Sequence, residues 1–202
     1  MSASSESRPV VSFSTLAKAM HGMSPVALTE LLRGHKQRSM GPRRSYQAAR
    51  RQAIDFLSEG VPFNVDAPLR SHEREAVRAL VACPPRLPRW VRGCRANRRE
   101  PWIVDGVRIS MTPDLELDGR LEGGVAKFSF TKKPLPTGVG NTMATLMWLH
   151  ERISRRSAAK KLHCIVFEPR ARRLYLPIAK PERALRSLKI TCAMICALWP
   201  LI

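Results

Sequence analysis

The spacing of apolar residues changes near residue 100 of this 202-residue chain. Before that point apolar side chains recur every three or four residues, which is the period of a helix that buries one face. The spacing predicts four helices, each beginning at a serine whose side chain can accept a hydrogen bond from a backbone N–H group. The predicted starts are Ser12 or Ser14, Ser24, Ser45 and Ser71.

Beyond residue 100 the period is two, which is typical of strands with one buried face. The segment WIVDGVRISM, 102–111, predicts two strands joined at Asp105-Gly106, a pair that suits a tight hairpin turn. More strands are predicted at 114–118, 124–131, 162–169 and 172–177, and helices at 141–154 and about 182–199. This order predicts an α+β fold with an α/β-like core, in which helices flank a mixed sheet of about five strands.

The domain organisation follows from the same pattern. Residues 1–68 are predicted to form a helical N-terminal extension, and residues 69–202 an α/β core that closes with a C-terminal helix. Between the two patterns lies a segment rich in proline and arginine, 83–101, which predicts a loop.

The net charge of the chain gives the strongest indication of its partner. The chain has 35 Lys and Arg against 16 Asp and Glu, a formal net charge of +19. Such an excess indicates a polyanionic partner, and nucleic acid is the first candidate, DNA before RNA. The alternative is a solvated arginine-rich surface without such a partner. The residues predicted to contact nucleic acid are Arg86, Arg89, Arg92, Arg95, Arg98, Arg99, Lys132 and Lys133.

The cysteines and the N-terminal residues indicate the cellular compartment of the protein. The five cysteines show no paired spacing, which argues against a disulfide framework. The first residues lack the layout of a signal peptide, and no apolar run reaches the length of a membrane span. We therefore expect a cytoplasmic protein without a membrane partner.

One short constellation carries candidate chemistry. Pro113-Asp114 precedes an alternating strand, and Lys127 lies in the next strand. With the surrounding order of helices and strands, this resembles the PD-(D/E)xK nuclease superfamily over residues 70–178. The resemblance implies a restriction-endonuclease-like core with Mg²⁺ as cofactor and phosphodiester hydrolysis as the reaction. It also implies that Asp114 and a second acid hold the metal and that Lys127 acts on the attacking water.

The second acid is where this sequence departs from the family. The position two residues before Lys127 holds Val125, so the sequence leaves open whether the protein is an active endonuclease or exonuclease, or a degenerate relative that only binds. Glu116, two residues from Asp114 and therefore on the same face of its strand, is the predicted replacement as ligand and catalytic residue. Glu122 is a further candidate metal ligand if Gly123-Gly124 forms a bulge that corrects its parity.

Two other functions compete with this interpretation. The helices on either side of His21-Gly22 have the outline of a helix-turn-helix, which predicts a non-enzymatic DNA-binding regulator that would use residues 24–33. The other is an interaction or assembly protein without a nucleic-acid partner.

Overall fold

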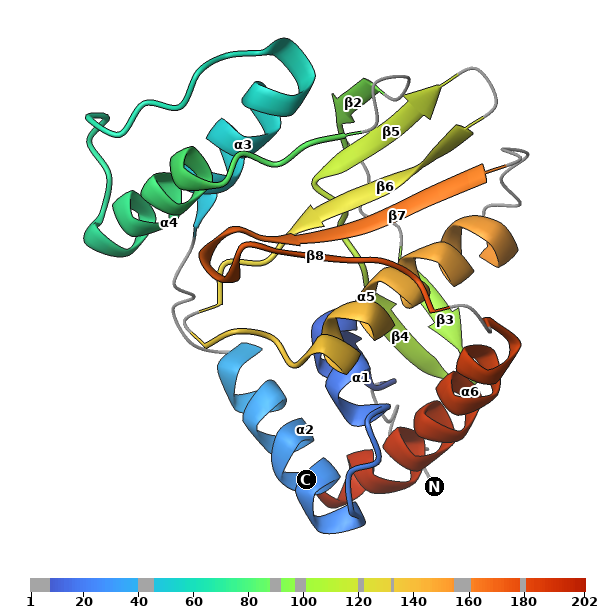
Figure 1. Cartoon of the computed structure of the whole chain (residues 1–202). Helices are drawn as coiled ribbons and strands as arrows, with labels where there is room; N and C mark the ends of the chain where they lie inside the picture. Colours follow the sequence, from blue (N-terminus) through green and yellow to red (C-terminus); the bar gives the residue numbers. More distant parts are fainter. Residues whose placement is uncertain are drawn as a thin grey trace.

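The computed structural model describes residues 8–39, 46–87, 92–96, 101–119, 122–131, 133–154, 161–178 and 181–202. Within these residues the protein is an α+β fold with a five-stranded and a three-stranded mixed sheet (Figure 1). The predicted fold class and the five-stranded sheet flanked by helices are confirmed.

The five-stranded sheet has the order β2-β5-β6-β7-β8. Only β6 and β7 pair in parallel, and they are joined through helix α5 (Thr137–Leu149) and a π-helical turn, His150–Ser154. The other neighbours are antiparallel. The strands are β2 (Arg92–Arg95), β5 (Leu115–Gly119), β6 (Glu122–Phe128), β7 (Lys161–Glu168) and β8 (Arg173–Tyr175).

The predicted hairpin forms, but in a second sheet. Its strands β3 (Pro101–Val104) and β4 (Val107–Ser110) are joined by Asp105 and Gly106, whose φ angles of 44° and 84° suit the turn. Strand β1 (Val10–Ser12) completes this sheet by pairing in parallel with β4. The sequence pattern does not predict β1, because three residues are too few to show a period.

Five more helices surround the sheets: α1 (Phe13–Ala19), α2 (Pro25–Ser39), α3 (Gln47–Glu59), α4 (Ser71–Ala82) and α6 (Pro181–Leu198). Two predicted serine caps are confirmed, since Ser12 Oγ accepts from Thr15 N and Ser24 Oγ from Ala27 N, both at 3.2 Å. The prediction for Ser71 is wrong, because it is the first helical residue and Arg70 precedes it as cap. Ser45 lies outside the described residues.

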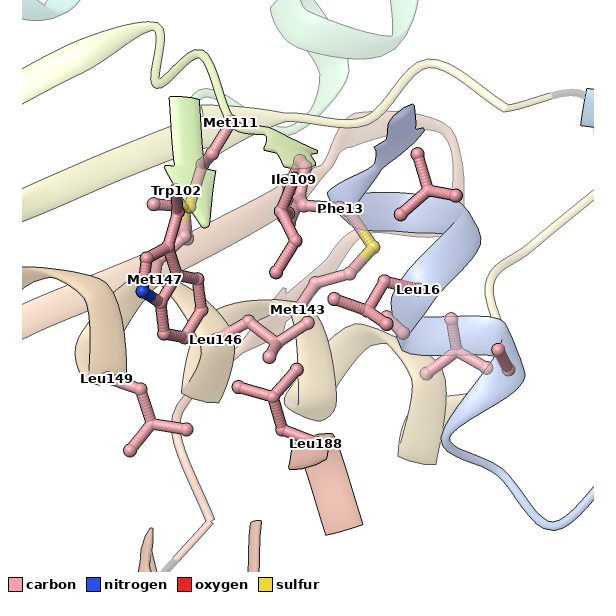
Figure 2. Close-up of a cluster of buried hydrophobic side chains, with 14 of the residues drawn as sticks. Phe13, Leu16, Trp102, Ile109, Met111, Met143, Leu146, Met147, Leu149 and Leu188 are labelled. Carbon is pink, nitrogen blue, oxygen red and sulfur yellow. The ribbon is translucent and has the colours of Figure 1, made fainter. Parts of the chain in front are cut away.

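Two hydrophobic clusters cover the two faces of the five-stranded sheet. Even-numbered β6 residues such as Ala126 pack with α3 and α4, whereas Val125 packs with α1, α5 and α6. Figure 2 shows the second of these regions, where Trp102 and Ile109 of the hairpin meet Met143 and Leu146 of α5. Because α1 and α2 pack in one cluster and α3 in the other, the predicted boundary at residue 68 does not coincide with the division of the core.

Helix α6 is unusually apolar for its exposure. Residues Glu182–Leu201 are long and apolar enough to cross a membrane, and 28% of the segment's most apolar window is buried inside the protein. Core helices of soluble proteins satisfy the same criterion, so this is weak support for a membrane role.

Candidate functional site

Asp114 and Lys127 come together at the start of β5. Asp114 is 6% exposed, and its Oδ1 lies 3.6 Å from Lys127 Nζ. Its Oδ2 accepts a 2.7 Å hydrogen bond from the backbone N–H of Phe128. Asp114 directly precedes β5 and Lys127 lies in β6, and the fold brings the two side chains within reach of each other.

Arg50 completes the group from helix α3. Its Nε lies 3.1 Å from Asp114 Oδ1, although its N–H does not point along a hydrogen-bond direction. Sequence reasoning missed this residue. The available signal was its place beside Ala49 and Ala53, on the flank of the buried face of α3. We refer to Arg50, Asp114 and Lys127 as the Asp114 cluster.

Lys127 is held away from water. Its Nζ donates to the carbonyl oxygen of Thr112 and lies 5.7 Å from the centre of the Phe13 ring. Burial lowers the pKa of Lys127, and Arg50 lowers it further, while Asp114 acts in the opposite direction. The lowering therefore comes mainly from removal of the ammonium group from water, because the acceptors around it favour the protonated form.

Glu116 shares a face with Val125, its direct partner across the strand pair. Val125 is 1% exposed and packs in the cluster with α5, and Glu116 is half-buried. Glu116 lies two residues along β5 from Asp114, which is about 6.6 Å at the rise of a strand. The structure therefore keeps Glu116 on the predicted face, next to Asp114 along the strand.

Glu122 lies elsewhere. It begins β6, five residues before Lys127, which is about 16 Å along a strand. Its Oε2 lies 2.6 Å from His163 Nε2. The pairing of β5 with β6 runs through Gly123 and Gly124 without interruption, so the bulge that would correct its parity is absent from this strand pair. Glu122 therefore does not join the Asp114 cluster.

Both oxygens of Asp114 have partners within the protein. One Asp114 oxygen faces two cationic side chains and the other accepts a backbone N–H, whereas Mg²⁺ requires free, hard oxygen ligands. The position of the second acid is the buried Val125. Within the described parts of the chain, no three His, Cys, Asp or Glu side chains form a metal-binding group.

The predicted arginine loop contains a strand. Arg92–Arg95 form β2, an edge of the five-stranded sheet, so the loop prediction is wrong there. The exposed Arg95 donates a 2.7 Å hydrogen bond to Asp55 of α3, and Arg92 stands opposite Asp118 of β5. Arg86 and Lys133 are exposed. Arg89, Arg98, Arg99 and Lys132 lie outside the described residues.

Helices α1 and α2 pack against each other as the helix-turn-helix prediction requires, but both also bury apolar residues in the core. The exposed residues of α2 include Val26, Glu30, Arg33, Lys36 and Gln37, so apolar, acidic and basic side chains are mixed there.

No family model, curated protein or solved structure matches this chain. Its function is therefore inferred from the arrangement of its own residues.

Proposed function

We propose that the protein binds nucleic acid along the edge formed by α3 and β2, and that the Asp114 cluster is a charged anchor for this edge. The observation that carries the proposal is the position of the cluster. Asp114 accepts cationic partners from α3 and β6, and its own carbonyl oxygen accepts from Ala96, the residue that follows β2. The arginine strand and the cluster therefore lie next to each other, with the cluster below the surface.

The balance of charge on this surface is positive. Asp114 faces Arg50 and Lys127, and Asp55 faces Arg51 and Arg95. These two acids are each matched by two cations, and the side chains of Arg51 and Arg95 are 75% and 54% exposed. Exposed guanidinium groups held in place by acids are suited to phosphate contacts.

The same geometry supports remote kinship with the PD-(D/E)xK superfamily as a degenerate relative. Asp114, at the entry to β5, faces Lys127 of the neighbouring strand β6, as the family motif requires. With Val125 buried in place of the second acid and Asp114 already bound by cations, we propose binding without cleavage.

The helix-turn-helix alternative is less well supported. An interface on α2 would use a surface that includes Glu30 and Val26, whereas α3 and β2 together expose three arginines, Arg51, Arg92 and Arg95. Since phosphate contacts supply most non-specific affinity, the arginine surface is favoured.

A salt titration tests the proposal. We expect binding to a random-sequence oligonucleotide to weaken steeply with salt. Replacing Arg51 and Arg95 by alanine should lower the slope of log affinity against log salt by about two, one for each lost phosphate contact. The control removes the same charge from α6, Arg183→Ala with Arg186→Ala. An equal effect of both variants, or no binding by the wild type at low salt, would contradict the proposed interface.

Cleavage is tested separately with Mg²⁺ or Mn²⁺ and the same oligonucleotide. We expect intact substrate with the wild type and with Asp114→Ala. A metal-dependent cut that disappears in Asp114→Ala would show that the cluster is catalytic and overturn the assignment.

A further inference from the structure

One pocket has no role in the function proposed so far. It has a volume of about 390 Å³ and lies between the segment that follows α4 and the turn between β7 and β8. Its lining comes from residues 82–86 and 167–169 and from 172–174. The volume falls within the range of small-molecule sites in proteins.

The walls of this pocket carry three guanidinium groups, those of Arg86, Arg172 and Arg173, and one carboxylate, Glu168. Glu168 is 1% exposed and accepts hydrogen bonds from Thr131, the backbone of Leu135, and Tyr175. Its oxygens are therefore engaged inside the protein. All three arginines are exposed, although Arg173 also contacts Tyr175. The pocket thus offers cationic donors to a ligand and has a net positive wall.

The rest of the lining is apolar. It includes Pro84, Pro85, Phe167 and Leu174, and Leu174 is 47% exposed. An apolar wall beside several guanidinium groups matches a flat heterocycle that carries a phosphate, because bases pack against apolar side chains and phosphates pair with arginine. This pattern fits a nucleotide better than a simple anion, which would leave the apolar wall uncovered.

The pocket is connected to the proposed interface. The segment after α4 runs from the pocket to Leu87, which packs in the cluster with α3 and α4 and lies against Gly93 of β2. The pocket borders β7 and β8, and β2 is the opposite edge of the same sheet. Four strand spacings separate the two edges, about 19 Å. A short stretch of single strand is long enough to reach from one to the other.

We propose that this pocket holds one nucleotide unit of a single strand, with the base against Pro84, Pro85 and Leu174 and the phosphate at Arg86, Arg172 and Arg173. This inference rests on the proposed nucleic-acid binding and specifies its substrate as single-stranded. A free nucleotide carries the same chemistry, so the experiment includes both forms.

The pocket supplies its own reporter, because Cys83 lines it and is partly exposed. The test measures alkylation of each cysteine by peptide mass spectrometry, in the full-length protein, with and without ligand. The ligands are adenosine monophosphate, a single-stranded oligonucleotide of about ten nucleotides, and its duplex. Cys196, partly exposed in a separate cavity beside Trp199, is the internal control.

We expect the single strand to slow alkylation of Cys83 at least about fivefold, because a pocket ligand is mostly buried, and to leave Cys196 unchanged. Protection by the free nucleotide at high concentration would support the pocket itself, and weaker protection by the duplex would support the preference for a single strand. Arg86→Ala with Arg172→Ala should abolish protection, whereas Arg183→Ala with Arg186→Ala should retain it.

The outcomes distinguish the two proposals. If the oligonucleotide binds but Cys83 reacts at its free rate, the pocket assignment fails and the interface on α3 and β2 stands. If no oligonucleotide binds, the proposed function fails. Unfolding of the pocket variant is checked by circular dichroism. Leu174→Glu, an exposed position, gives a second variant that should also lose protection, because a carboxylate in the wall repels phosphate.

Discussion

Removing the charge of Asp114 should destabilise the protein more than removing the charge of a surface acid. Asp114→Asn leaves Lys127 buried without its carboxylate partner and weakens the link between α3 and the sheet. Loss of one partner from a buried ion pair typically costs about 3 kcal/mol. Urea unfolding of the wild type and the variant measures the difference.

The matched control is Asp55→Asn. Asp55 also pairs with two arginines, but both are largely exposed. Surface pairs contribute at most about 1 kcal/mol. Equal losses in the two variants would show that the Asp114 cluster is no more than a surface pair.

Lys127 should make stability depend on pH in the alkaline range. Burial lowers its folded-state pKa below the ordinary 10.5. Between the lowered pKa and 10.5 the unfolded chain holds more protons than the folded one, so the free energy of unfolding rises with pH. Denaturation of the wild type at several alkaline pH values should show this rise relative to Lys127→Met. A constant difference between the two proteins would contradict the prediction.

Tyr175 should change the free energy of unfolding in the opposite direction, lowering it as the pH rises. Burial, followed by its hydrogen bond to Glu168, raises the pKa of Tyr175 from 10.0 to about 12. The folded state then binds the extra proton between these values, so its contribution to stability is complete below pH 10 and is lost as pH rises through 12. Ultraviolet titration of a Tyr46→Phe variant, in which Tyr175 is the remaining tyrosine, should show ionisation near 12. Ionisation of Tyr175 near pH 10 in the folded protein would contradict the raised pKa.

At the scale of elements, the parallel pair of β6 and β7 depends on Gly124. Its φ is +139°, and a Cβ there would lie 2.0 Å from the carbonyl oxygen of His163. Gly124→Ala should therefore disrupt the strand pair and cost several kcal/mol, or give insoluble protein.

Gly22→Ala is the matched control for Gly124→Ala. Gly22 also has a positive φ, of +70°, but a Cβ at this position would have no heavy atom within 4 Å outside its chain neighbours. Only the conformational cost remains, about 1 kcal/mol. Thermal unfolding of both variants compares the two effects, and similar melting temperatures would rule out a clash at Gly124.

The elements also show what the sequence pattern can and cannot predict. The hairpin was predictable because Asp105 and Gly106 adopt the positive φ that their residue types favour. Strand β2 was not, since Gly93 and two arginines give no alternation of apolar and polar residues. It is a strand because Cys94 and its neighbours pair with β5. That pairing is a long-range contact, which local pattern does not encode.

The same limit applies to the candidate site. Strand parity correctly placed Asp114 and Lys127 together and excluded Glu122 unless a bulge formed. Arg50 lies 64 positions before Asp114 and reaches it only because α3 packs on the sheet. The pocket around Cys83 likewise joins segments from two distant parts of the chain.

At the scale of the whole molecule, the net charge of +19 should make stability depend on salt. Like charges repel in the compact state, and screening shortens their range from about 30 Å at 0.01 M salt to about 10 Å at 0.1 M. The melting temperature should therefore rise over this range, and a polyphosphate at equal ionic strength should raise it further. A melting temperature that falls with added salt would show that attractive pairs outweigh the repulsion.

The pairing of β1 with β4 has a consequence for synthesis on the ribosome. Val10 pairs with Arg108, so the first strand emerges 98 residues before its partner. At about 5 to 20 residues per second, the interval is about 5 to 20 seconds. During this interval the apolar residues of β1, Val10 and Val11, lack their native neighbour. Nascent chains should therefore bind chaperones, and slow translation upstream of residue 110 should lower the yield.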